Sequence, residues 1–409
     1  MSLTCTVQYL SSYFKLVRVF SRTIFLAGMD SIFPTLVIKR FYSHLNTTVA
    51  ILAAYKGEMP FAHFLKNFFS QYKKFGSKDR KQITELCFCY FRLGAAFPQL
   101  SMEQKVVKGF QLTRQNWPVE WLDFFSTFQL PDNDPENIFS FSEKLSEGVE
   151  RSEFEKSFLT QPDLFLRIRP GYEKNVTDKL SAASVNFIKE DSCIRLPNSS
   201  KIDEVVVVNK EVVVQDYSSQ RVGEILKLYQ SQISNSPSKI SIWDCCAASG
   251  GKSILAKDIL KNINLTVSDI RPSILANLRK RFAEAGLNGY QSFIADATIA
   301  NPGQQFDLVV ADVPCSGSGT WARTPEQLIY FDEKEVDRFA ALQQRILSNV
   351  INYLKPGGHL LFITCSVFAK ENEDQVYFLQ QNGLQLIEQK IIKGYHQKAD
   401  TMFAALLKN

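Results

Sequence analysis

The chain has 409 residues, of which 45% are hydrophobic and 22% are charged. These proportions exclude a disordered chain, and the length exceeds what one ordinary hydrophobic core organises, so we expect two or three domains. The net charge of +5 permits a polyanionic partner such as a nucleic acid but does not require one.

Residues 1–28 form an N-terminal extension whose assignment the sequence leaves open. The stretch 10–28 combines Phe14, Phe20 and Phe25 with basic residues and contains no acidic residue. It is compatible with a weak targeting segment or a basic amphipathic anchor, or with an upstream extension of a protein that starts nearer Met29. No run of about 18 apolar residues occurs, so we expect no membrane-spanning helix.

Residues 29–155 carry apolar side chains at helical spacing, which predicts a small helical domain. Ser77 is expected to cap a helix that continues to about Leu93. A further helix, or two short ones, is expected over residues 142–157. Residues 160–235 then alternate as strands do and predict a small α+β subdomain. Its expected strands lie at residues 164–169, 187–188, 205–208 and 211–215.

Residues 240–409 alternate between strand and helix patterns, which predicts a parallel sheet with helices on both faces. A long helix over 332–354 is expected to end before Pro356, and a strand is expected over 359–364. Two final strands, 384–392 and 401–407, have no helix between them and should pair as an antiparallel hairpin at the sheet edge. The predicted fold class is therefore α/β: a Rossmann-like sheet with a C-terminal hairpin, preceded by the α+β subdomain and the helical domain.

The eight cysteines show no regular ladder of spacings and no CxxC pair, and the chain has only four histidines. This pattern favours reduced thiols in a cytoplasmic protein over a disulfide framework. We expect no structural metal, because no second pair of ligands accompanies the closely spaced cysteines.

A turn of small residues follows the first strand of the expected parallel sheet and opens a helix. In such sheets the ligand lies over the carboxyl ends of the strands, where backbone N–H groups at a helix start can hold a polar group. Asp269 ends the second strand, where a carboxylate can bind both ribose hydroxyls, and Asp296 follows the third, where adenine would lie. The turn itself comprises Cys246, Ala247, Ala248, Ser249, Gly250, Gly251 and Lys252.

A phosphate-binding P-loop is the rival interpretation of this turn, because Gly251-Lys252-Ser253 resembles the end of that motif. A P-loop also requires a glycine at the position that Cys246 occupies. We therefore favour a nucleoside-bearing methyl donor, S-adenosylmethionine, over a nucleoside triphosphate.

Two cysteines follow the fourth and fifth strands of the same sheet, Cys315 after Asp312-Val313-Pro314 and Cys365 after Thr364. Because neighbouring strand ends face one cleft, we expect these thiols to meet there. One thiolate can add to C6 of a cytosine and make C5 nucleophilic, and a base must then remove the C5 proton. Asp312 could bind N3 or the exocyclic amine of the base. Buried structural cysteines, or a disulfide between them, are the alternatives.

These residues resemble the RsmB/Nop/Sun family of RNA (cytosine-5) methyltransferases over roughly residues 160–409. The resemblance implies that Cys365 is the nucleophile, that Cys315 assists product release, and that residues 246–252, Asp269, Asp296 and Asp312 bind the donor. It also implies an RNA-recognition-like subdomain before the Rossmann sheet. The matching segments are DCCAASGGKS, DIRPSILANLRKR, IADAT, DLVVADVPCSGSGTWARTPE, QQRILSNVINYLKPGG, ITCSVFAKENEDQV and VVVQDYSSQ. The helical domain, with FGSKDRKQITEL, resembles the NusB-like module of some members.

Two departures from the family pattern concern the donor turn and the RNA contacts. Ser249 stands where the family usually has proline, so we expect a less rigid loop that still binds the donor. Arg323 is the one arginine retained where the family often carries two, and is a candidate phosphate contact. Further candidate contacts to RNA are Lys78 and Arg80 in a basic cluster, and Arg167 and Arg169 on one strand face.

The sequence thus favours a monomeric methyltransferase that acts on RNA, and on ribosomal RNA in particular, with no membrane partner. The target base should be unpaired or flipped out of a helix to reach Cys365. A non-catalytic RNA-binding assembly factor is a second hypothesis, against which the intact thiol pair argues. A small-molecule methyltransferase is a third, and it leaves the helical domain and the basic residues without a use.

Overall fold

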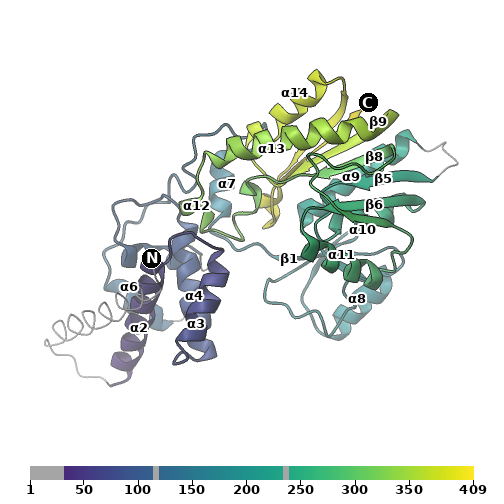
Figure 1. Ribbon diagram of the computed structural model, residues 1–409. Helices are drawn as coiled ribbons and strands as arrows, with labels where there is room; N and C mark the ends of the chain where they lie inside the picture. Colours follow the sequence, from purple (N-terminus) through teal and green to yellow (C-terminus); the bar gives the residue numbers. More distant parts are fainter. Residues whose placement is uncertain (1–31, 114–118, 234–238) are drawn as a thin grey trace. The chain divides into compact units, whose positions relative to one another are not determined.

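The computed structural model describes residues 32–113, 119–233 and 239–409, which fall into two compact units (Figure 1). The first unit contains the described residues up to 140 together with 158–160 and 321–331. The second contains residues 141–157, 161–320 and 332–409. The expected N-terminal extension, residues 1–28, lies outside the described residues.

The first unit is helical, as the sequence predicts. Gly109 lets two of its helices pack closely, because a Cβ atom there would lie 2.3 Å from the carbonyl oxygen of Cys89. The buried guanidinium of Arg92 donates hydrogen bonds to the carbonyl oxygens of Phe158 and Ala322, which ties the two later segments into this unit. The helices are α2 (Ile32–Ala54), α3 (Phe61–Gln71), α4 (Ser77–Arg92), α5 (Met102–Thr113), α6 (Val119–Ser126) and α12 (Gln327–Tyr330).

The second unit begins with α7 (Arg151–Ser157) and a four-stranded antiparallel sheet in the order β2-β3-β1-β4. The expected strand over residues 205–208 is wrong, because the Val207 N–H donates to the Glu211 carboxylate and the Val207 carbonyl accepts from the Glu211 N–H, which forms a turn. The elements are β1 (Leu164–Ile168), α8 (Glu173–Ala182), β2 (Ile188–Glu190), β3 (Cys193–Leu196) and β4 (Val212–Val214).

A seven-stranded sheet follows in the order β10-β11-β9-β8-β5-β6-β7. Strands β5 to β9 run parallel, and β11 is antiparallel to both β9 and β10, which confirms the C-terminal hairpin. The strands are β5 (Ile240–Asp244), β6 (Ile263–Asp269), β7 (Gln291–Ile294), β8 (Phe306–Asp312), β9 (Leu354–Thr364), β10 (Gln385–Ile392) and β11 (Met402–Lys408). The helices are α9 (Tyr217–Gln232), α10 (Gly251–Leu260), α11 (Pro272–Glu284), α13 (Glu335–Val350) and α14 (Glu373–Gln381).

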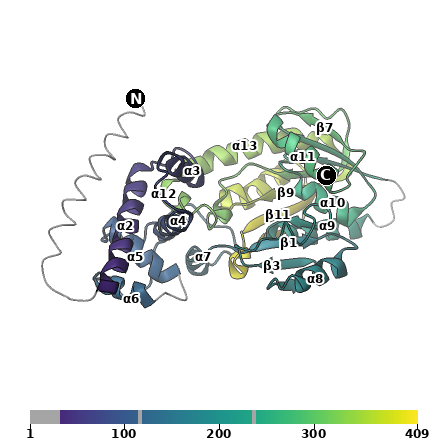
Figure 2. The same ribbon diagram turned by 90° about the horizontal axis from the view of Figure 1, so that it is seen from below.

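Side chains alternate between the two faces of this sheet, and each face has its own core. On β5, Ile242 packs in a cluster with residues of α9, α10 and α11, whereas Trp243 packs in a second cluster with residues of α13 and α14. The two sets of helices cover opposite faces of the sheet (Figures 1 and 2). The Rossmann-like arrangement expected from the sequence is therefore confirmed, and every parallel strand ends at the same edge.

Two expected helices are shorter than the sequence pattern indicates. The long helix α13 stops at Val350, and β9 already begins at Leu354, so that the Pro-Gly-Gly run lies inside the strand. Residues 142–149 are not helical, because they pair with a distant segment: Leu145 forms a β-bridge with Phe368, and the Ser146 N–H donates to the carbonyl of Val367.

Candidate active site

Cys315 and Cys365 meet beyond the carboxyl ends of two neighbouring parallel strands. Strands β8 and β9 pair with Asp312 beside Ile363, and each chain then continues to its cysteine. The two Sγ atoms lie 3.2 Å apart, and the backbone N–H of Cys365 donates to the sulfur of Cys315 at 3.4 Å. Both thiols are free and half-buried. The structure therefore brings together the two cysteines that the strand pattern places in one cleft.

The two thiols differ in their electrostatic surroundings. The hydrogen bond with Cys365, burial and the nearby Glu371 carboxylate raise the pKa of Cys315 well above its usual range. A protonated Cys315 can donate its hydrogen to the sulfur of Cys365. The geometry thus places two sulfur atoms where a proton can pass from one to the other.

The small-residue turn, residues 246–250, connects β5 to α10 at the point where the strand order reverses between β5 and β8. Gly250 has a φ of +81°, and a Cβ atom there would lie 2.3 Å from a ring carbon of Phe282. Ala248 also has a positive φ, and its N–H donates to the carboxylate of Asp269 at 3.0 Å. Helix α10 starts at Gly251, so its first N–H groups face this turn.

Asp269 is the last residue of β6, and Asp296 lies two residues after β7, so both stand at the carboxyl ends of these strands. Arg271 donates to both carboxylate oxygens of Asp269, and these bonds keep the pKa of Asp269 below its usual value despite burial. Thr298 donates to Asp296 from its backbone N–H and its hydroxyl, and these bonds lower the pKa of Asp296. Both groups are therefore ionised acceptors at neutral pH, which suits the hydroxyl and amine donors of a nucleoside.

Exposed apolar side chains accompany these two carboxylates. Ile270 is 59% exposed, Ile294 is 56% exposed and Ile299 is 80% exposed. Hydrophobic periodicity does not single these residues out, although isoleucines next to strand-end aspartates are a signal for an apolar surface that a planar base can cover. The residues present at these strand ends therefore fit an adenine nucleoside.

Lys252 connects the turn to Asp312. Its Nζ donates to the Asp312 carboxylate at 3.1 Å and to the hydroxyl of Ser219 at 2.9 Å. The next residue, Ser253, donates its hydroxyl to Asp244 at 2.6 Å. In a P-loop these two side chains would serve phosphate and magnesium. Here both are bound to carboxylates, which argues against the nucleoside triphosphate interpretation.

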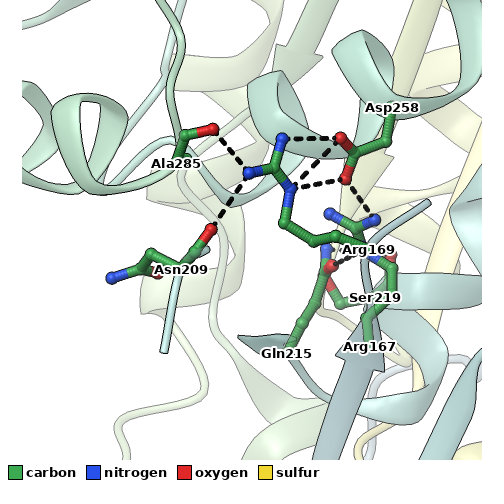
Figure 3. A network of polar contacts seen from close by, with 7 residues as sticks. All are labelled: Arg167, Arg169, Asn209, Gln215, Ser219, Asp258 and Ala285. Carbon is green, nitrogen blue, oxygen red and sulfur yellow. Dashed lines mark hydrogen bonds and ion pairs between the residues drawn. The ribbon is translucent and has the colours of Figure 1, made fainter. Parts of the chain in front are cut away.

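Arg167 of β1 and Arg169, which directly follows that strand, form a buried network with Asp258 of α10 (Figure 3). Their side chains are 5% and 12% exposed, and that of Asp258 is 6% exposed. Arg169 also donates to the carbonyl oxygens of Asn209 and Ala285. Because both guanidinium groups are held inside the unit, the geometry gives no support to the expected phosphate contact. They join the α+β subdomain to the helix that follows the donor turn.

The same network extends towards the thiol site through Gln215. The side-chain oxygen of Gln215 accepts from Arg167 at 2.8 Å, and its amide nitrogen donates to the Ser219 hydroxyl at 3.1 Å. Ser219 in turn accepts from Lys252. A continuous chain of hydrogen bonds thus runs from β1 to Asp312, which the sequence pattern does not reveal.

The remaining candidate RNA contacts lie in the first unit. Lys78 is exposed on the first turn of α4. Arg80 donates to the carbonyl oxygen of Phe75 at 2.9 Å and lies over the ring of Phe69. Arg323 is exposed in the segment 321–331. All three positions stay candidates for phosphate contact.

The described residues contain neither a cluster of metal ligands nor a membrane-spanning helix. Within the ranges 32–113, 119–233 and 239–409, no three histidine, cysteine or acidic side chains are grouped so that they could hold a metal ion. Across the same ranges, no helix is both long enough and apolar enough to span a membrane.

Residues 232–407 match the family model described as 16S rRNA methyltransferase RsmB/F. This part of the chain, which is less than half of it, is similar to RsmB/F methyltransferases. Two curated relatives are named ribosomal RNA small subunit methyltransferase B. That of Xanthomonas campestris pv. campestris is 31% identical over 200 residues, which are 46% of this chain and 44% of that protein. That of Shewanella oneidensis is 30% identical over 210 residues, which are 48% of this chain and 47% of that protein. The chain thus spans less than half the length of each relative.

Two solved structures resemble this chain in fold. The crystal structure of PH0851 has a TM-score of 0.64 at 16% identity, and the match covers 93% of this chain and 100% of that chain. The structure of NSun6 from Pyrococcus horikoshii with SFG has a TM-score of 0.53 at 14% identity. That match covers 63% of this chain and 93% of that chain.

Proposed function

We propose that this protein transfers a methyl group from S-adenosylmethionine to C5 of a cytosine in RNA, and that ribosomal RNA is its substrate. The observation that carries this proposal is the contact between two free thiols, 3.2 Å apart, beside the ion pair of Lys252 and Asp312. The similarity to RsmB/F methyltransferases and the names of the curated relatives support a ribosomal RNA substrate.

The residues of the donor site have separate tasks in this proposal. Residues 246–252 provide the backbone cradle, Asp269 binds the ribose hydroxyls, and Asp296 accepts from the adenine amine. S-adenosylmethionine, when bound there, supplies an electrophilic methyl group.

Cys365 is the nucleophile in this proposal. Its thiolate adds to C6 of the cytosine, so that a sulfur–carbon bond forms and the electrons of the C5–C6 double bond become available at C5. Asp312 accepts a hydrogen bond from the exocyclic amine of the base and orients the ring, while Lys252 holds the Asp312 carboxylate in place.

Cys315 completes the reaction after C5 has been methylated. Once its own proton has passed to water, the Cys315 thiolate takes the C5 proton, and the electrons of that C–H bond re-form the double bond. The bond between C6 and Cys365 then breaks, and its electrons return to the sulfur of Cys365. A high pKa suits this task, since a more basic sulfur binds the departing proton more strongly. The product then leaves with both thiols free.

RNA labelled with tritium at C5 of cytosine tests the proposed function. Methylation at C5 must release the tritium to water, whereas methylation at nitrogen or at the ribose retains it. We expect release from small-subunit ribosomal RNA that depends on S-adenosylmethionine and is lost in Cys365→Ala. The matched control is Cys193→Ala, which removes a buried thiol of the α+β subdomain and should keep activity. Methyl transfer without tritium release would exclude the C5 position.

A further inference from the structure

Glu371 is a fully buried carboxylate that contacts both thiol-bearing loops. It is 0% exposed and ends a short 3-10 turn, Ala369–Glu371, before α14. One oxygen accepts from the backbone N–H of Ser316 at 2.7 Å, and the other accepts from the Ser316 hydroxyl at 2.5 Å. The second oxygen also accepts from the hydroxyl of Ser366.

The partners of Glu371 are the residues that directly follow the two cysteines. Ser316 is next to Cys315, and Ser366 is next to Cys365. The loops are also joined by the Gly319 N–H, which donates to the carbonyl oxygen of Cys365 at 2.9 Å. One carboxylate thus contacts both of the short segments whose sulfur atoms lie 3.2 Å apart, and it adds to the direct hydrogen bonds between them.

The hydrogen bonds of Glu371 to Ser316 and Ser366 are strengthened by the burial of its carboxylate. Burial raises the pKa of Glu371, and the hydrogen bonds from Ser316 and Ser366 oppose that rise. Hydrogen bonds to a charged group contribute about 1.5–3 kcal/mol each, more than bonds between neutral groups. Without the carboxylate, the Ser316 N–H would lose its acceptor in a site that is largely closed to water.

We propose that Glu371 is a positioning residue that holds the thiols of Cys315 and Cys365 at contact distance. The spacing itself is a property of the folded chain. Its catalytic consequence rests on the proposed function, since a nucleophile at C6 and a base at C5 must reach neighbouring atoms of one ring.

Phenylarsine oxide measures this spacing without RNA or methyl donor. The arsenical bridges two thiols: two arsenic–sulfur bonds form, and its oxygen leaves as water with the two thiol protons. It binds tightly only when both sulfur atoms are close together. The variant Cys315→Ala gives the background from other closely spaced cysteines, such as Cys245 and Cys246, and mass spectrometry of peptides locates the bridge.

Three variants separate positioning from general stability. Glu371→Leu fills a similar volume without accepting hydrogen bonds, and we expect it to weaken arsenical binding at this pair by about tenfold or more. Glu371→Gln keeps an acceptor for Ser316 and should stay within about threefold of the wild type. The matched control is Glu333→Gln: Glu333 accepts from the Ser142 hydroxyl and the Glu143 N–H and touches neither thiol loop, so no change is expected.

In the methylation assay, Glu371→Leu should lower kcat and leave the KM for RNA unchanged. Unchanged arsenical affinity in Glu371→Leu would overturn the positioning role. If that variant does not fold, Ser366→Ala removes one of the connections and should still weaken arsenical binding; wild-type affinity there would overturn the role equally. Arsenical results as expected in a protein that methylates no RNA would remove the proposed function and leave the positioning role standing.

Discussion

The Nζ atom of Lys252 lies 3.1 Å from a carboxylate oxygen of Asp312, although the two residues are 60 positions apart in the sequence. The lysine comes from the first turn of α10 and the aspartate from the end of β8, so the ion pair joins the donor turn to the thiol site. Their side chains are 10% and 31% exposed, which leaves Asp312 accessible to a base.

Replacing Lys252 by methionine should therefore reduce catalysis. Loss of a charge-assisted hydrogen bond that orients Asp312 corresponds to about 1.5–3 kcal/mol, or roughly 10- to 100-fold in single-turnover rate. The control is Lys257→Met on the same helix, because Lys257 is half-buried and donates to the carbonyl oxygen of Lys261, away from Asp312. Equal rates in the two variants would show that Lys252 does not orient Asp312.

Gly250 and Gly251 offer a matched pair for the donor turn. Gly250→Ala places a Cβ atom 2.3 Å from Phe282 at a φ of +81°, so the turn or the ring must move. At Gly251 the nearest atom to a new Cβ is 3.9 Å away. We expect Gly250→Ala to weaken S-adenosylmethionine binding by about tenfold or more in calorimetry, since the variant must distort the cradle.

Gly251→Ala should fold normally and bind the donor more tightly than Gly250→Ala does. The reverse order of affinities would mean that the cradle does not depend on the left-handed conformation at Gly250.

Asp244, buried below the donor turn, should make stability depend on pH. Burial raises the pKa of its carboxyl to about 7 in the folded protein, whereas an unfolded aspartate titrates near pH 4. The folded state thus binds this proton more tightly, so the free energy of unfolding falls as pH rises from about 4 to 7. Asp244→Asn removes that dependence.

Urea unfolding at pH 5 and at pH 8 measures this effect. We subtract the free energy of unfolding of the wild type from that of Asp244→Asn at each pH. This difference should be larger at pH 8 than at pH 5. A stability difference that does not change with pH would contradict the raised pKa.

Arg167 should matter for stability and not for the salt dependence of RNA binding. Arg167→Met leaves the buried Asp258 with one partner fewer, and we expect a loss of about 3 kcal/mol in the free energy of unfolding. Because the guanidinium is buried, the slope of RNA affinity against salt concentration should stay unchanged. If a folded Arg167→Met variant instead shows a slope reduced by about one, the loss of one phosphate contact, then Arg167 does contact RNA. The control is the exposed Arg279→Met on α11.

The thiol pair could be predicted because it depends on local patterns and one topological rule. Cys315 and Cys365 each follow an apolar strand, and ends of neighbouring parallel strands share an edge, so their meeting needs no side-chain detail. The donor turn is predictable for the same reason, since its small residues sit between a strand and a helix.

The burial of Arg167 and the fate of residues 142–149 could not be predicted in this way. The alternation on β1 shows that Arg167 and Arg169 share a face, but only the packing of α10 against β1 brings Asp258 to that face. Residues 142–149 have a helix-compatible pattern, yet they form an extended segment instead. The segment around Phe368, more than 200 residues away, supplies the backbone hydrogen bonds that stabilise this extended conformation. Contacts of this range leave no periodic trace in the sequence.

Covalent trapping of RNA tests the central claim most directly. Each cysteine variant is incubated with ribosomal RNA and S-adenosylmethionine, and the RNA-linked protein is separated on a denaturing gel. We predict that Cys315→Ala accumulates an adduct through Cys365, because it can attack and cannot remove the C5 proton, whereas Cys365→Ala forms none. An adduct in Cys365→Ala and none in Cys315→Ala would contradict the assignment of the two thiols.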